Sequence, residues 1–160
     1  MIYDRIVEQA RNPKFYTHMG VPDDLIGRYN MIVIHLTILF ASANRLDEDE
    51  AAELRQQTFE QFMHEMESMV RDLGIDGEHV QHEVKNIAGI SSKQIMIYEH
   101  ALANGGMSGL CAEIRADFLK THEHSAVDAA ALAGYMLKSI AKVKAASPVS
   151  ILTGQIEFAA

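Results

Sequence analysis

The sequence predicts an all-α protein, a single-domain helical bundle of about six helices over residues 1–160, with an ordered Pro/Gly connector after the first helix. Apolar residues recur at helical spacing in every long segment. The chain has 160 residues, 48% of them hydrophobic and only 3 of them proline, which suits one globular domain with a sizeable core. No internal repeat or linker divides it.

The first helix is expected to end near Arg11. Pro13 and Pro22 fix their own φ and push the residue before each toward extended geometry. Gly20 and Gly27 then allow turns that a Cβ would strain. The connector between these breakers carries apolar anchors, and we expect it to be ordered. The anchors are Phe15, Tyr16, Met19 and Val21.

A central helix is predicted from about Gly27 to Arg45. Its segment Met31–Ala41 is apolar apart from His35 and Thr37. That run is far shorter than the roughly 20 residues that span a bilayer, so it indicates a buried core helix. We expect Met31–Phe40 to be the most buried part of the protein.

Capping patterns and glycines place the later helices. Asp47 and Glu50 form a capping-box pattern before a long helix that Gly74 should end. The next helix is expected from Asp76 to Asn104, with a kink or break at Gly89.

Two further helices and a tail complete the prediction. Met107–Phe118 is the first of these helices, and the second is expected to be capped by Ser125 with Asp128 and to include Val127. The tail after Pro148 is expected to pack as an extended or irregular arm.

Composition excludes several functions. The net charge is −8, with 14 basic and 22 acidic residues, which argues against nucleic-acid recognition. One cysteine, Cys111, excludes an internal disulfide and a cysteine zinc site. No secretory or transit leader is visible, so we expect the chain to stay in the compartment where it is made.

A search for catalytic and metal-binding motifs finds none. Di-iron bundles need Glu-x-x-His pairs, which are absent, and His64-Glu65 is followed by Ser68 where a zinc protease helix has a second histidine. The pair His79 and His82 is read as exposed side chains near a helix end. Nucleophile elbows and phosphate loops are also missing. We therefore expect no catalytic residue, no metal and no cofactor.

Residues 10–35, ARNPKFYTHMGVPDDLIGRYNMIVIH, resemble a signature of the ubiquinol-cytochrome c chaperone family, whose members assist assembly of respiratory complex III. The resemblance continues in FMHEMESMVRDLG at 62–74, IDGEHVQHEVKNIA at 75–88, Tyr98–Leu102 and the closing GQIEF. Where members have an aromatic and basic patch, this chain has GISSKQ at 89–94, which removes charge that could serve a ribosome or membrane contact.

The resemblance implies a non-enzymatic assembly chaperone that binds newly made cytochrome b, or another apolar client, in the cytoplasm. Peripheral association with the inner membrane or the ribosome would fit this role. An apolar surface with polar rims is the physical requirement. The residues expected to contact the partner are Tyr16, Val21, Pro22, Asp23, Arg28, His35, Met63 and Met66. The alternative function is a helical adaptor or regulatory module that binds a soluble protein.

Each group of contact residues also has a purely structural interpretation. Met63, Met66 and Met69 recur along one helical stripe, and flexible thioethers suit varied apolar partners, yet such a stripe more often forms core. Asp23, Arg28 and His35 could instead form an internal hydrogen-bonded network that holds the connector against the central helix.

Overall fold

The computed structural model describes residues 1–160 and is 78% helical, with no strand. Six helices have nine residues or more, and two have five. In chain order the elements are α1 (Ile2–Ala10), α2 (Pro13–Thr17), α3 (Leu25–Ser42), the 3₁₀ turn η1 (Ala43–Arg45), α4 (Glu48–Asp72), α5 (Glu78–Asn104), α6 (Gly106–Thr121), α7 (Ala129–Ala145) and α8 (Pro148–Leu152). The predicted all-α bundle is confirmed.

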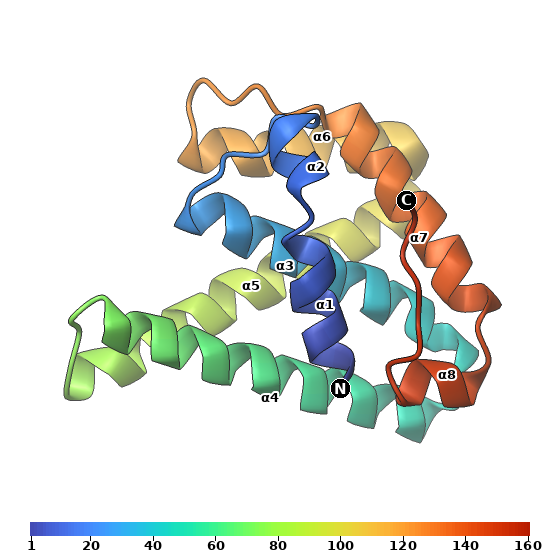
Figure 1. Ribbon diagram of the computed structural model, residues 1–160, viewed down its shortest axis with the longest axis horizontal. Coiled ribbons are helices and arrows are strands. Elements are labelled where there is room, and N and C mark those ends of the chain that lie inside the picture. Colours follow the sequence, from blue (N-terminus) through green and yellow to red (C-terminus); the bar gives the residue numbers. More distant parts are fainter.

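Helix α3 runs through the middle of the bundle, and α1, α4, α5, α6 and α7 all pack against it (Figure 1). Every residue from Asn30 to Phe40 is buried, which confirms the prediction for the central segment. The helix continues into η1, and the 21 residues Leu25–Arg45 are long and apolar enough to cross a membrane. Neighbouring helices bury 67% of its most apolar window, as expected for a core helix.

Side-chain caps set where the helices begin. The Asp24 carboxylate accepts the Gly27 N–H at 2.8 Å, so α3 begins at Leu25, two residues before the predicted start. The predicted capping box of α4 is present in both directions, between Asp47 and Glu50. Gly74 follows α4 with φ +87°, the left-handed conformation that ends a helix.

The connector is ordered, and it contains the short helix α2 that the sequence pattern did not predict. Asn12 caps α2, and Phe15 within it has no exposed surface. Farther along, the Asp128 N–H donates to the Met19 carbonyl at 2.8 Å, which ties the connector to the start of α7. Gly20 lies so close to the Ala126 carbonyl that a Cβ would sit 2.1 Å from its oxygen. The connector is therefore fixed from both sides.

Three boundary predictions were wrong in detail. Helix α5 continues through Gly89 without a break, as one helix of 27 residues. Asp128 alone caps α7, while the Ser125 hydroxyl accepts the Val127 N–H, so Val127 lies outside the helix. The tail begins with α8 before it becomes extended, because Ser147 caps a turn that Pro148 opens.

Candidate functional site

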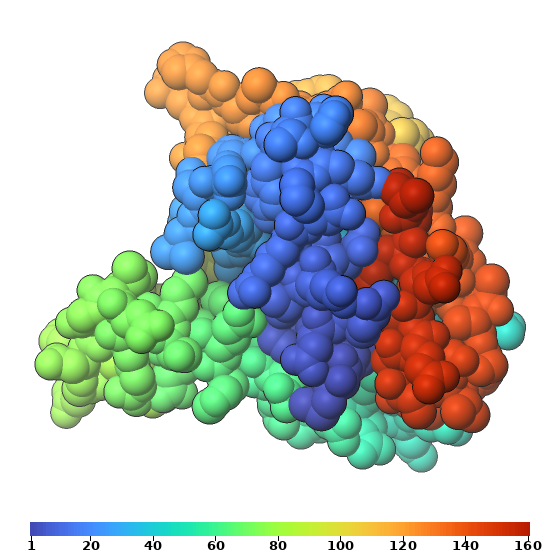
Figure 2. All heavy atoms as spheres, viewed as in Figure 1, coloured from blue at the N-terminus to red at the C-terminus, as the bar shows by residue number.

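A cavity of about 490 Å³ lies where the connector and the first turns of α3 face the second half of α4. Figure 2 shows this face hollowed between the blue connector and the green end of α4. The cavity is lined by Ala10, Arg11, Pro13, Tyr16, Thr17, Asp23, Leu25, Arg28, Tyr29, Ile32, Glu65, Met66 and Met69. Four of the predicted contact residues, Tyr16, Asp23, Arg28 and Met66, therefore meet here.

The rim of this connector cavity is charged. Both Nε and Nη2 of Arg28 donate to Asp23 Oδ1, at 3.1 and 2.9 Å, and both side chains are more than half exposed. Arg11 lies 4.0 Å from Glu65 across the cavity, and Glu65 also accepts the Tyr3 hydroxyl. Burial is the main cause of the raised pKa of the Tyr3 hydroxyl. The rim therefore has two ion pairs that are open to solvent, Asp23–Arg28 and Arg11–Glu65.

The floor of the connector cavity is apolar. Met66 is 3% exposed, Ile32 is 8% exposed, and Tyr29 and Met69 are half-buried. The Tyr29 hydroxyl hydrogen-bonds Ser91 Oγ at 2.6 Å, which fixes its ring. Met63 does not line the cavity and packs, half-buried, against the core. Of the methionine stripe, Met66 thus belongs to the core and also lines the cavity.

Val21 and Pro22 support the rim from behind. The Val21 N–H donates to the Phe15 carbonyl at 3.1 Å, and the Val21 side chain is buried. Gly27 lies against the Pro22 carbonyl, where a Cβ would come within 1.8 Å of the oxygen. This close approach brings Asp23 up to the first turn of α3. The backbone, more than the ion pair, shapes the connector at this point.

His35 lies in the core, away from the connector cavity. It has no exposed surface, and its ring nitrogens bond the Met31 carbonyl and the Tyr135 hydroxyl, both at 2.7 Å. The rings of Phe15 and Phe158 pack edge-on against it. Burial lowers the pKa of the imidazole to about 4, so His35 is neutral at neutral pH. His35 shares no network with Asp23 and Arg28, and in this conformation it offers no surface to a partner.

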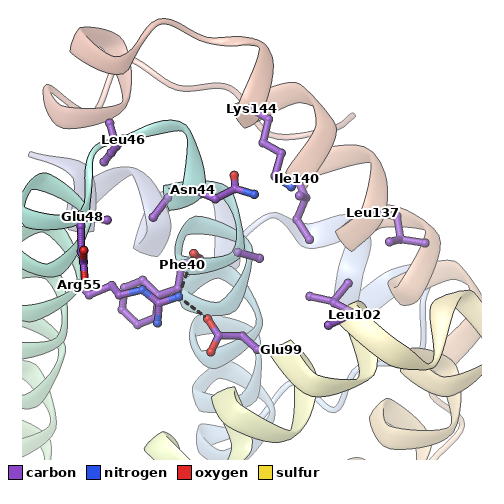
Figure 3. A pocket seen from close by; sticks show the side chains of 14 residues that line it. Phe40, Asn44, Leu46, Glu48, Arg55, Glu99, Leu102, Leu137, Ile140 and Lys144 are labelled. Atoms are coloured by element: carbon purple, nitrogen blue, oxygen red, sulfur yellow. Dashed lines mark hydrogen bonds and ion pairs between the residues drawn. The ribbon is translucent and has the colours of Figure 1, made fainter.

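A second cavity, of about 720 Å³, opens between the end of α3, the start of α4, the end of α5 and α7 (Figure 3). Arg55 from α4 crosses its wall, donating to the Phe40 carbonyl at 3.1 Å and to Glu99 of α5 at 2.7 Å. The Arg55 guanidinium also lies over the Phe40 ring. These contacts join three helices, so we assign Arg55 a structural role.

A third cavity, of about 430 Å³, adjoins the connector cavity, since Leu25, Tyr29 and Met69 line both. Sequence reasoning missed it, because its walls come from four separate helices, α3, α4, α5 and α6. The remaining lining residues are Ile26, Asn30, Ile87, Ile90, Lys93, Gln94, Ile97, Asp117, Lys120 and Thr121. The one local signal was an asparagine, Asn30, next to the most apolar part of the chain.

The structure gathers no group of three or more His, Cys, Asp or Glu side chains that could hold a metal ion. The histidine pair at 79 and 82 is exposed near the start of α5, without a third ligand.

Two comparisons with known proteins found a match. A family model described as ubiquinol-cytochrome C chaperone matches residues 17–158. The crystal structure of the Cbp3 homolog from Brucella abortus is similar, with a TM-score of 0.86 at 24% identity, over 99% of this chain and 87% of that one. This likeness shows the same fold. A comparison with curated protein sequences gave no match.

Proposed function

Since the chain belongs to the ubiquinol-cytochrome c chaperone family, we propose that it binds newly made cytochrome b and holds it during assembly of the ubiquinol-cytochrome c reductase complex. It is an assembly chaperone of this complex by family. The family role is not catalytic. The observation that carries the proposal is the family match over 142 of the 160 residues, from 17 to 158.

The connector cavity supports the proposal. A protein that holds an apolar client needs apolar surface that stays open to solvent, bordered by polar groups that keep the protein soluble. Leu25, which is 45% exposed, and the half-buried Tyr29 and Met69 meet the first need, above a buried floor of Ile32 and Met66. The Asp23–Arg28 and Arg11–Glu65 pairs meet the second. Of the predicted partner residues, Tyr16, Asp23, Arg28 and Met66 make up the contact set that we propose.

The proposed place of action is the cytoplasm, at the face of the inner membrane where an apolar client would insert. An acidic chain, at −8, is repelled by an anionic membrane surface, so we expect the client and not the lipid to recruit it.

Affinity capture from detergent-solubilised membranes tests the client. The tagged chain should retain cytochrome b or another haem-protein subunit of the complex. Recovery of soluble proteins only would favour the adaptor function instead.

Arg28→Ala tests the cavity in a deletion strain. The variant should restore less of the ubiquinol-cytochrome c reductase level than the wild type, because the Asp23–Arg28 rim is lost while the helices remain. Arg71→Ala is the matched control, since Arg71 pairs with Glu67 on α4, is similarly exposed and lies outside the cavity. Equal restoration by both variants would remove Arg28 from the contact set.

A further inference from the structure

The third cavity has a composition that the client-binding role does not explain. Its apolar wall includes Leu25, Ile26 and Ile90, which are 45%, 43% and 62% exposed at its mouth. Ile87 and Ile97 lie half-buried behind them. A volume of about 430 Å³ falls within the range of small-molecule sites in proteins.

One polar group in this wall has no partner within the protein. Asn30 is 5% exposed, and its Nδ2 makes no hydrogen bond. Leaving such a donor buried and unpaired costs roughly 1–3 kcal/mol, and an apolar residue of similar size would avoid that cost. Because Nδ2 itself has almost no accessible surface, it can donate to a ligand oxygen once the side chain turns toward the cavity that it lines.

The charges at this cavity favour an anion. Lys93 and Lys120 both line it, and neither is ion-paired with an acidic side chain. The one acidic side chain of the wall, Asp117, already accepts the Tyr98 hydroxyl at 2.9 Å. Burial raises the pKa of the Asp117 carboxyl, and the nearby Lys120 partly offsets that rise. In a chain of net charge −8 this cavity has a local excess of positive charge.

We propose that the third cavity binds a single-chain lipid with an acidic head group. The acyl chain lies against Leu25, Ile26, Ile87, Ile90 and Ile97, and the head group meets Lys93, Lys120 and the free amide of Asn30. An uncharged apolar molecule would leave all three donors unused. A large partner, such as a protein, could reach the buried Asn30 only by entering the cavity, which has the volume of a small-molecule site. The shared wall of Leu25, Tyr29 and Met69 places this lipid beside the connector cavity.

Equilibrium dialysis of the full chain with monomeric palmitate, and with 1-hexadecanol as the neutral counterpart, tests the head group. Palmitate should bind saturably at one site and more tightly than hexadecanol. The double variant Lys93→Ala/Lys120→Ala should weaken palmitate binding by about three- to tenfold and leave hexadecanol binding unchanged. Equal affinity for the two ligands, or no saturable binding by the wild type, would overturn the proposal.

Two variants on α5 test the location. Ile90→Glu puts a carboxylate at the mouth of the cavity and should abolish palmitate binding. Met96→Glu is the matched control, because Met96 is 68% exposed on the same helix and does not line the cavity. Equal loss in both variants would mean adsorption to exposed apolar surface, which contradicts the site.

Asn30→Leu separates a binding role from a structural one. It removes an unpaired donor, so the melting temperature should rise while palmitate affinity falls. Tighter palmitate binding by this variant would contradict the role of the amide. Binding that occurs only on phosphatidylcholine–phosphatidylglycerol vesicles, and not with monomeric palmitate, would assign the lysines to a membrane surface and reject the cavity.

Discussion

Arg28 and His35 lie seven residues apart on α3, two turns along one face of the same helix, and yet their surroundings are opposite. The Arg28 side chain is 60% exposed and bonds only Asp23, five residues before it. His35 has no exposed surface and bonds Tyr135, a hundred residues away. Both residues were predicted to belong together at a partner surface or in one internal network, and the structure separates them.

The difference comes from what covers the helix. Phe15, Tyr135 and Phe158 reach His35 from three distant segments, and together they remove water from the imidazole. At Arg28 the connector contributes only Asp23, and the guanidinium stays exposed to solvent. Whether a polar residue on a helix is buried thus depends on which distant segments pack over it. Its position along its own helix does not determine its burial.

The largest expected effect is that of His35→Ala. The substitution leaves a cavity in the core and removes one of the two hydrogen-bond partners of the Tyr135 hydroxyl, the other being Gln9, so the free energy of unfolding should fall by about 3 kcal/mol. Urea denaturation followed by circular dichroism at pH 7 measures it. His79→Ala, at an exposed position, should change less than about 0.5 kcal/mol. A similar loss in both variants would mean that burial is not what distinguishes His35.

His35 should also make the folding stability depend on pH, because acid favours the unfolded chain. Burial lowers the pKa of His35 from 6.5 to about 4, so between these values the unfolded chain holds a proton that the folded chain does not. Stability is full above pH 6.5 and falls toward pH 4, by about 1.4 kcal/mol per pH unit. Between pH 7 and pH 5 the wild type should therefore lose about 2 kcal/mol more than His35→Gln. Parallel curves for the two proteins would contradict the shift.

A smaller effect on stability than that of His35→Ala is expected from Arg28→Ala. An exposed ion pair contributes about 0–1 kcal/mol, and the Gly27–Pro22 contact holds the connector without it. A double-mutant cycle with Asp23→Ala should give a coupling in that range, and less at high salt. A coupling of several kcal/mol would place the pair in the structural framework and not in the binding rim.

The sequence predicted the helices well because their signals are local. The capping box of Asp47 and Glu50, the glycine at 74 and the apolar run at 31–40 each act within one or two turns. Short elements were missed for the opposite reason: α2 and α8 have five residues each, too few for a periodic pattern. Their caps, Asn12 and Ser147, were the available signals.

The site was predicted only in part. Tyr16, Asp23 and Arg28 are close in sequence, and the structure keeps them together around one cavity. Met66 joins them from α4, which periodicity could align with an apolar face but could not place against the connector. The third cavity joins Asn30 to Lys93 and Lys120 through contacts between distant helices, and no local pattern encodes such a meeting.

The C-terminal segment after α8 completes the packing around α1 and α3. Gly154 packs directly against Ile2, and four residues later the Phe158 ring reaches His35. Synthesis runs from the first residue to the last, so that side of α3 stays uncovered until residue 158 has left the translating ribosome. A nascent chain stopped after α7 already has α1 and α4 to α7 packed against α3, and it lacks only the cover that Phe158 gives to the side of α3 around His35. The aromatic cluster around His35 is therefore completed only when the C-terminal segment packs against α3.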